Sequence, residues 1–290
     1  MLLYSYAKLN LYLDILGKRK DGYHNLTTIF ERISLCDRIT LKPRRDKKIK
    51  ITVDSPLVPA GRTNLAYRAA ALLEDTFKTK RGLDIKISKR IPVGSGMGGG
   101  SSNAACVLLG LNELWGLRLS RSKLLRLAGK LGADVPFFIL GTPFARGRSR
   151  GDRVSPLAGL KKVRLWHVLV VPKIPVSTPS VYKKWDEMTQ KVRLTRPDYD
   201  VKLLTLALEK KDFSLIGKAL FNCLERVSIR LYPEILRVRE KLERLGFKSV
   251  LMSGSGPAVF GIVSSKKEAL SLIRQLKGNR HWQVFLTRTV

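Results

Sequence analysis

Apolar and β-forming residues dominate several short stretches in the first ninety residues. Residues 6–15 and 29–34 are rich in such side chains, and this composition predicts two strands. Residues 39–41 and 49–53 predict a further pair of strands, joined around a basic turn. Over residues 83–88 apolar and polar side chains alternate strictly, which is typical of a half-buried strand. The N-terminal region is therefore predicted to be built largely on a β-sheet.

Three segments of the same region have helical periodicity. Over residues 64–77 apolar side chains recur three or four positions apart, and Thr63 is a candidate cap. Residues 102–114 present an apolar face, and residues 122–131 form a third such segment that ends at Gly132. We expect a helix over each segment.

Strands and helices alternate in the second half, without an internal repeat. The predicted elements are a strand at 165–171, a mostly helical region at 200–230, a helix at 233–245, a strand end at 250–251, a strand at 258–263, a helix at 265–276 and a strand at 283–287. From the helix at 233–245 onward, the content is that of a ferredoxin-like split βαβ layer. Because 290 residues exceed the usual size of one domain, we predict two domains, residues 1–155 and 156–290.

Residues 92–102 form a glycine-rich segment between a predicted strand and a predicted helix. Five of the seven positions from Gly94 to Gly100 are glycine, so a ligand can approach the main chain at the start of a helix. A Walker-type loop would need lysine where Gly100 stands, and a dinucleotide fingerprint would need an acid after a second strand, whereas Glu113 falls inside the helix. A flexible linker would not join a regular strand to a regular helix. A phosphate cradle of a third type is the remaining interpretation.

The net charge of the chain bears only on which partners the protein would bind. Lys and Arg total 55 against 23 Asp and Glu, which gives a formal net charge of +32. Such a field favours anionic partners, either a polyanionic small substrate or nucleic acid. The basic residues are spread along the chain, which favours a compositional bias without a specific partner.

The remaining composition indicates an ordinary globular protein. Hydrophobic residues make up 44% of the chain, enough for substantial cores, and no apolar run is long enough to span a bilayer. The N-terminus lacks the pattern of a secretory signal. Three scattered cysteines form neither a disulfide framework nor a zinc pattern. We therefore expect a cytoplasmic protein.

The glycine-rich segment resembles the second sequence motif of the GHMP kinases, a family of ATP-dependent small-molecule kinases. Residues 7–13 and 252–260 are similar to motifs near the two ends of chains in that family, so the resemblance spans almost the whole chain. It implies an α+β fold of two domains. The N-terminal domain would be ribosomal S5 domain 2-like, and the C-terminal domain would be a ferredoxin-like α/β layer.

Two further segments narrow the resemblance to one branch of the GHMP kinases. Residues 21–24 (Asp-Gly-Tyr-His) and 131–138, together with residues 7–10, are similar to the kinases that phosphorylate a hydroxyl on the erythritol part of a CDP-linked substrate in the non-mevalonate isoprenoid pathway. The resemblance implies ATP and Mg²⁺ as cofactors and a small CDP-linked alcohol as substrate.

The resemblance also implies catalytic roles for two residues. Asp134 would be the general base, and Lys8 would orient the hydroxyl and favour the ionised carboxylate, because a nearby cation stabilises it. Taken alone, Asp134 between Gly132 and Pro136 favours a cap or turn aspartate, and only the motifs favour the base. Lys8 alone likewise favours a solvated lysine on a strand, because the chain has 55 basic residues.

Residues for ATP and Mg²⁺ follow from the same resemblance. The expected ATP-binding residues are Asn64, Pro92, Val93, Gly94, Ser95, Gly96, Met97, Gly98, Gly99, Gly100, Ser101 and Ser102. Asn64 is equally consistent with a residue that merely starts a helix. Ser101 and Ser102 are candidate magnesium ligands beside the phosphates, and Glu74 is a further candidate.

Substrate contacts are expected from several segments far apart in the sequence. They are Asn10, Tyr23, His24, Phe30, Thr178, Gly254, Ser255 and Gly256, with Thr178 in a loop after the strand at 165–171. Tyr23 would stack on the cytosine base and His24 would hydrogen-bond its edge, while Phe30 would cover the other face. Asp21 and Gly22 are also a hairpin-turn sequence, and both interpretations can hold together.

Two rival functions remain open at this point. A sister GHMP kinase acting on another alcohol would have no base for the 21–24 segment to bind. A basic RNA-binding protein would suit the charge and the S5-like half, but RNA binding does not require a glycine cradle with Lys8 and Asp134. Nucleic acid is therefore the less favoured partner, and we expect a monomer or a weak homodimer.

Overall fold

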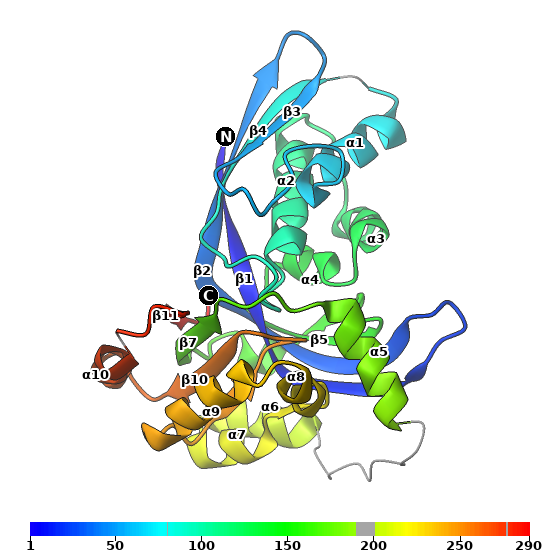
Figure 1. The fold of residues 1–290 in the computed structure, drawn as a ribbon. Coiled ribbons are helices and arrows are strands. Elements are labelled where there is room, and N and C mark those ends of the chain that lie inside the picture. Colours follow the sequence, from blue (N-terminus) through cyan, green and yellow to red (C-terminus); the bar gives the residue numbers. More distant parts are fainter. Residues whose placement is uncertain (80, 190–200, 277) are drawn as a thin grey trace.

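Two long antiparallel strands run through the whole molecule in the computed structural model, which describes residues 1–79, 81–189, 201–276 and 278–290. They are β1 (Leu2–Lys18) and β2 (His24–Arg44), and they form a ribbon with a tight turn (Figure 1). The predicted strands at 29–34 and 39–41 are therefore parts of one strand. Register shifts let the ribbon bend while its apolar side chains stay buried on both halves of the protein.

The N-terminal sheet is assembled around this ribbon. At one end β2 pairs with β4 (Gly82–Ser88), and β4 pairs in parallel with β3 (Ile49–Val53). The predicted pairing of residues 39–41 with 49–53 is wrong, because β4 lies between them. Leu83, Ile85 and Ile87 are almost fully buried, which suits an interior strand. At its other end β2 pairs with β5 (Phe144–Ser149), which pairs with β6 (Arg153–Pro156).

Four helices cover one face of this sheet (Figure 1). They are α1 (Leu65–Phe77), α2 (Gly99–Leu114), α3 (Arg121–Leu131) and α4 (Val135–Leu140). The first three were predicted, but α1 is capped by Asn64 and not by Thr63, since the Asn64 side chain accepts a hydrogen bond from the Ala66 amide. Helix α2 begins three residues earlier than predicted, inside the glycine-rich segment, and α4 was not predicted.

The C-terminal half carries a four-stranded antiparallel sheet in the order β11-β7-β10-β9. Its elements are β7 (Trp166–Pro172), α9 (Glu234–Arg244), β9 (Val250–Met252), β10 (Val259–Val263), α10 (Lys266–Leu276) and β11 (Trp282–Arg288). The central pair is formed by the first and third of these strands in chain order. This is the arrangement of the predicted ferredoxin-like layer.

Between β7 and α9 the chain forms additional short elements. They are α5 (Thr178–Thr189), α6 (Val201–Lys210), α7 (Phe213–Ala219), β8 (Phe221–Asn222) and α8 (Glu225–Leu231). A short 3-10 turn, η1 (Ala158–Leu160), precedes β7. Strand β8 pairs in parallel with the middle of β1. The predicted loop around Thr178 is wrong, because Thr178 is the first residue of helix α5.

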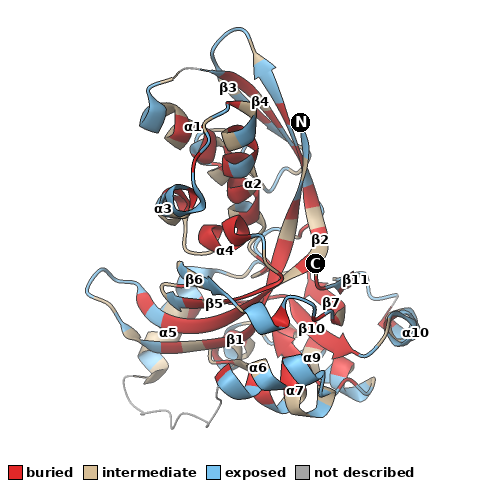
Figure 2. Cartoon of the chain, turned by 180° about the vertical axis from the view of Figure 1, so that it is seen from behind, coloured by how far each residue is buried: buried red, intermediate tan, exposed pale blue. Residues whose placement is uncertain are grey.

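One hydrophobic cluster joins the two halves. It packs Leu9 and Leu11 of β1 with Leu169 of β7 and Phe260 of β10, all fully buried. Figure 2 shows this buried layer where the ribbon crosses the C-terminal sheet. The domain boundary between residues 155 and 156 falls within β6 and stays a prediction. Within the described ranges, no helix has the length and apolar character needed to cross a membrane.

Candidate active site

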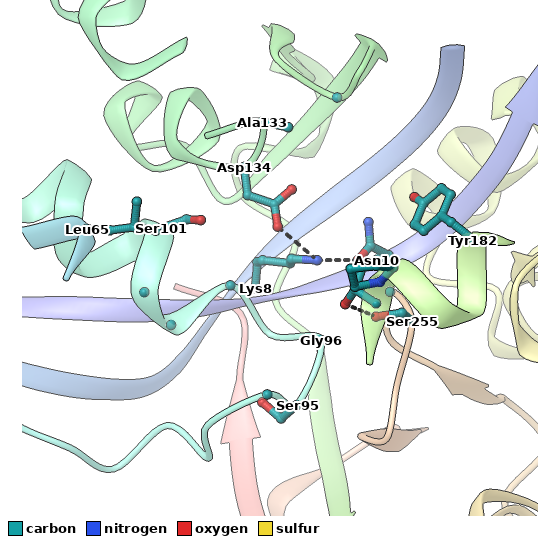
Figure 3. Close-up of a pocket in the computed structure, with 18 of the residues that line it drawn as sticks. Lys8, Asn10, Leu65, Ser95, Gly96, Ser101, Ala133, Asp134, Tyr182 and Ser255 are labelled. Atoms are coloured by element: carbon teal, nitrogen blue, oxygen red, sulfur yellow. Dashed lines mark hydrogen bonds and ion pairs between the residues drawn. The ribbon is translucent and has the colours of Figure 1, made fainter. Parts of the chain in front are cut away.

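An open cavity of about 950 Å³ collects most of the predicted site residues. Its walls come from the β1–β2 ribbon, the start of α1, the glycine-rich segment, the loop before α4, helix α5 and the turn at 254–255. In Figure 3, Ser101 and Leu65 lie on one side of the view, Tyr182 lies on the other side, and Lys8 and Asp134 lie between them. Segments from the whole length of the chain therefore meet in one cavity.

The glycine-rich segment forms one wall and ends in the first turn of α2. Gly94, Gly96 and Gly98 all have positive φ angles, of 65°, 77° and 68°, which glycine adopts without strain. Helix α2 starts at Gly99, so its first amide groups lack partners within the helix and border the cavity. A helix start of this kind attracts phosphate groups.

Two residues of the segment turn their side chains away from the cavity. Met97 is fully buried in the core, and its carbonyl accepts a hydrogen bond from the Lys8 amide at 3.0 Å. The Ser102 hydroxyl accepts a hydrogen bond from the Ser5 hydroxyl at 2.8 Å and is almost fully buried. The structure thus brings the other nine residues of 92–102 to the cavity, but not the side chains of these two.

The glycine-rich segment also touches the C-terminal half directly. A Cβ atom on Gly96 would lie 2.3 Å from the carbonyl oxygen of Ser253. The Ser253 hydroxyl donates to the Gly96 carbonyl at 3.3 Å and accepts from the Asn10 backbone N–H at 3.2 Å. Only glycine permits this approach, which fixes the loop against β1 and the C-terminal turn.

A buried lysine and a carboxylate meet in the middle of the cavity. Lys8 is 4% exposed, and its Nζ lies 3.5 Å from Asp134 Oδ2 and donates to Asn10 Oδ1 at 2.5 Å (Figure 3). The Asn10 side-chain Nδ2 in turn donates to the Thr28 hydroxyl at 2.8 Å. Lys8 is therefore no solvated strand lysine. Asp134 directly precedes α4 but makes no capping hydrogen bond, and its carboxylate remains one-third exposed to the cavity.

Tyr23 and His24 both line the cavity, at the turn of the ribbon. The Tyr23 side chain is 55% exposed, and the guanidinium of Arg150 lies 5.0 Å from its ring centre. His24 is buried, and its Nε2 lies 2.7 Å from Asp186 Oδ1. An exposed aromatic ring and a fixed imidazole thus stand side by side in the sequence and in the wall.

Phe30 also lines the cavity, but as part of its floor. Its ring is 1% exposed, stacks on Phe137 at 4.9 Å and lies 5.6 Å from Lys8 Nζ. This position beside Lys8 suits a support for the central pair. The expected contact with the second face of a base is better suited to another ring, Tyr182.

Besides Thr178, helix α5 supplies four wall residues that the sequence did not indicate, among them Tyr182 and Asp186. The Tyr182 ring lies 5.1 Å from the His24 ring, and burial raises the pKa of its phenol, which keeps it neutral. Partial burial raises the pKa of Asp186, but hydrogen bonds from Lys18 and His24 outweigh that effect, so the pKa lies below its usual range. In the sequence, the signal that could have indicated them is the occurrence of aromatic and acidic residues in the segment after β7.

The substrate residues expected in the C-terminal half divide into two groups. Thr178, Gly254 and Ser255 line the cavity, and the hydroxyls of Thr178 and Ser255 are hydrogen-bonded at 2.7 Å. Gly256 is not among the lining residues. A Cβ atom there would lie 2.7 Å from the Met252 sulfur, so this glycine permits the packing beneath the turn.

Asn64 lines the cavity, although both polar ends of its side chain are occupied. Its Oδ1 accepts from the Ala66 amide, and its Nδ2 donates to the Pro59 carbonyl at 2.8 Å. The structure therefore supports the simpler interpretation, a helix cap that happens to border the cavity.

The magnesium candidates differ in their positions. Ser101 lines the cavity, whereas the Ser102 hydroxyl is turned to Ser5 and the Glu74 carboxylate accepts from the Arg81 amide outside the lining. Among the described residues no cluster of three or more His, Cys, Asp or Glu side chains is suited to a metal. Magnesium sites are commonly completed by water and by phosphate oxygens of the substrate, with few ligands from the protein.

A buried carboxylate supports the glycine-rich wall from behind. Asp37 is fully buried and accepts hydrogen bonds from the Arg90 and Ile91 amides at 2.7 and 2.9 Å, from Asn103 Nδ2 at 2.9 Å, and from the Lys89 ammonium group. These donors stand immediately before the segment and within α2. Asp37 thus ties both ends of the segment to β2.

Comparison with known proteins agrees with this geometry. The GHMP kinases N terminal domain matches residues 64–142, and the GHMP kinases C terminal domain matches residues 204–280. A protein of Geobacillus sp. (strain WCH70), named 4-diphosphocytidyl-2-C-methyl-D-erythritol kinase, is 42% identical over 275 residues, 94% of this chain and 91% of that protein. The chain belongs to the 4-diphosphocytidyl-2-C-methyl-D-erythritol kinase family.

Further members and relatives of the 4-diphosphocytidyl-2-C-methyl-D-erythritol kinase family support this assignment. The protein of that name from Acetivibrio thermocellus is 40% identical over 289 residues, 99% of this chain and 98% of that one. A solved structure of a 4-(cytidine 5'-diphospho)-2C-methyl-D-erythritol kinase is 36% identical with a TM-score of 0.82, and each chain is covered completely. A mevalonate kinase structure, 15% identical with a TM-score of 0.74, shares the fold. The predicted fold class is confirmed, and this family member is an ATP-dependent kinase.

Proposed function

We propose that this chain transfers the γ-phosphoryl group of ATP to a hydroxyl on the erythritol part of 4-diphosphocytidyl-2-C-methyl-D-erythritol, in the non-mevalonate isoprenoid pathway. The observation that carries the proposal is the position of the Lys8–Asp134 pair in one cavity, between the glycine-rich wall and the aromatic wall (Figure 3). The names of relatives about 40% identical to this chain support the substrate.

Asp134 is the proposed general base. Its carboxylate is exposed to the cavity and makes no capping hydrogen bond, so it is free to accept the proton of a substrate hydroxyl. Lys8 is held by Asn10, and its cation lies within 3.5 Å of that carboxylate. We propose that Lys8 orients the hydroxyl and balances negative charge while the γ-phosphoryl group moves from ATP to the alcohol oxygen and ADP leaves.

ATP is proposed to lie with its phosphates against the start of α2. The free amides at Gly99 to Ser101 and the positive end of the helix dipole favour bound phosphate. Mg²⁺ would be bound by phosphate oxygens with the Ser101 hydroxyl as a protein ligand, and would neutralise charge on the β- and γ-phosphates. The domain formed by residues 1–155 would then hold both ATP and the catalytic pair.

The cytidine is proposed to occupy the opposite end of the cavity. Tyr23 offers an exposed ring for stacking, Tyr182 offers a second ring on α5, and His24 offers a ring nitrogen to the edge of the base. Asn10, Thr178, Gly254 and Ser255 border the space between this end and Lys8. All these groups come from one chain, which is compatible with a monomer or a weak homodimer.

The proposal is tested by measuring ATP consumption by the purified protein with Mg²⁺ and 4-diphosphocytidyl-2-C-methyl-D-erythritol. Mevalonate, homoserine and galactose serve as parallel substrates. We expect turnover only with the CDP-linked alcohol. Turnover with another of these alcohols would retain the kinase and refute the substrate, and RNA binding without ATP turnover would favour the basic RNA-binding function.

A further inference from the structure

The two ring nitrogens of His24 have different surroundings. Nε2 lies 2.7 Å from Asp186 Oδ1, in a wall where His24 is only 7% exposed. Nδ1 makes no hydrogen bond to any residue in the described part of the chain, and the ring borders the cavity. The rings of Tyr182 and Trp185 lie 5.1 and 5.7 Å from the imidazole, so its orientation is fixed by packing as well as by Asp186. One nitrogen is therefore held by the protein and the other is left for a ligand.

The state of Asp186 decides which nitrogen of a neutral His24 carries the hydrogen. Its second oxygen, Oδ2, accepts a hydrogen bond from the Lys18 ammonium at 2.6 Å. An ionised carboxylate with these two partners can only accept hydrogen bonds. The nitrogen facing it, Nε2, must then be the N–H group, and Nδ1 carries the lone pair.

We infer that Asp186 is a positioning residue that makes the site prefer cytosine to uracil, by holding His24 with an acceptor nitrogen toward the base. The inference rests on the proposed binding of a cytidine beside Tyr23 and His24. At ring position 4 cytosine carries an amino group that donates hydrogen bonds, whereas uracil carries a carbonyl oxygen. A lone pair on Nδ1 accepts from the amino group and faces another acceptor when uracil is bound.

The aromatic contacts of this site do not supply the same discrimination. Stacking on Tyr23 or Tyr182 is tolerant of base identity, because every base has a π-face. A site built to hydrogen-bond one polar group rejects an analogue that leaves its own group unpaired. The His24–Asp186 pair is a feature of this wall that can distinguish the two pyrimidines.

The kinetic test compares 4-diphosphocytidyl-2-C-methyl-D-erythritol with its uridine analogue, 4-diphosphouridyl-2-C-methyl-D-erythritol. Asp186→Asn keeps the shape, but its amide can donate as well as accept, so the tautomer of His24 is no longer fixed. We expect kcat/KM for the cytidine substrate to fall about tenfold, and the preference over uridine to shrink by about the same factor, which is of the order expected for one base-reading hydrogen bond. The KM for ATP should stay unchanged.

Glu187→Gln is the matched control, because it removes the same charge from the next residue of α5. Glu187 is about half exposed and forms its ion pair with Lys184, outside the cavity. We expect its preference for cytidine to equal that of the wild type. An equal loss of kcat/KM for both substrates in Asp186→Asn, or wild-type turnover without preference between them, would overturn the inference and leave the kinase function intact.

A second measurement needs neither substrate nor an Asp186 variant. The chain has three histidines, so selective ¹⁵N labelling and two-bond ¹H–¹⁵N correlation can resolve each imidazole, with His24→Gln used for assignment. We expect the neutral form of His24 to carry its hydrogen on Nε2. Protonation on Nδ1 alone, or an even mixture of tautomers, would refute the inference whether or not the substrate proposal holds.

Discussion

Replacement of Asp134 by asparagine removes the proposed base and leaves its shape in place. The carboxylate lies 3.5 Å from Lys8 Nζ and is one-third exposed, and it makes no capping bond to α4. Lys8 is buried but keeps its hydrogen bond to Asn10, so loss of the charge at residue 134 should lower the free energy of unfolding by about 1–3 kcal/mol, between the values for exposed and buried pairs. We therefore expect Tm to fall by less than about 10 °C, and a Tm well above the assay temperature shows that a loss of activity is not a loss of fold.

The expected effect on catalysis is much larger. General base catalysis contributes about 10²–10⁴ in rate, so kcat for the CDP-linked alcohol should fall by that factor in Asp134→Asn. The variant keeps the glycine-rich wall, so the KM for ATP should change less than about threefold. A coupled assay of ADP formation measures both parameters, and a fluorescent ATP analogue checks binding separately.

A double variant separates a catalytic pair from two independent contributions. Residues that act as a unit have non-additive effects, so Lys8→Met with Asp134→Asn should be no slower than the slower single variant. Multiplication of the two single effects would contradict a joint role. Wild-type kcat in Asp134→Asn would refute the assignment of the base altogether.

Three other expectations follow from single contacts. Gly96→Ala should lower Tm and raise the KM for ATP, because its Cβ would lie 2.3 Å from the Ser253 carbonyl oxygen. Gly94→Ala is the control: its φ is also positive but its Cβ would meet open space, so it should lose only the backbone contribution of about 1–2 kcal/mol. Equal losses of stability in the two variants would contradict the close approach at Gly96. Tyr23→Ala should raise the KM for the CDP-linked alcohol about tenfold but not that for ATP, and an equal rise in both would exclude base stacking. Asp37→Ala should lower the free energy of unfolding in urea by about 3–5 kcal/mol, because it leaves the buried Lys89 ammonium group and the Arg90 and Ile91 amides unpaired. A loss below about 1 kcal/mol would show that the hydrogen bonds to Asp37 are not needed for stability.

Local sequence patterns were sufficient to predict an element where one of its faces is buried along its whole length. Leu83, Ile85 and Ile87 alternate with polar residues, and the strand was predicted in its observed place. The partner of that strand was predicted wrongly, because the order of strands depends on contacts between distant segments. Residues 49–53 pair in parallel with β4, and their composition resembles that of any short edge strand.

Helix α5 shows why part of the site was missed. Val181, Trp185 and Met188 recur at helical spacing and pack against the C-terminal core, so a helix could have been predicted there, but only a loop around Thr178 was expected. Even a predicted helix would not have shown that Tyr182 and Asp186 face the cavity, because that depends on how the helix packs against the ribbon. Lys8 and Asp134 carry no local signal of their own either, and only the family resemblance connected them.

Neighbouring residues of the same motif also differ in ways that the sequence does not show. Ser101 and Ser255 line the cavity, whereas Ser102 and Gly256, the next residue in each case, do not. The Ser102 hydroxyl is bound by Ser5 of β1, a partner almost a hundred residues away in the chain. Which of two adjacent side chains reaches the cavity is decided by such contacts, and these exist only in the assembled fold.

The proposed reaction is tested most directly by transfer of labelled γ-phosphate from ATP to 4-diphosphocytidyl-2-C-methyl-D-erythritol, with ³¹P NMR of the product. We expect one new phosphomonoester on the erythritol part, formed by the wild type and reduced about 10²–10⁴-fold in Asp134→Asn. Absence of label from the CDP-linked alcohol, with label on mevalonate, homoserine or galactose instead, would contradict the proposed substrate. Equal labelling by both proteins would contradict the proposed base.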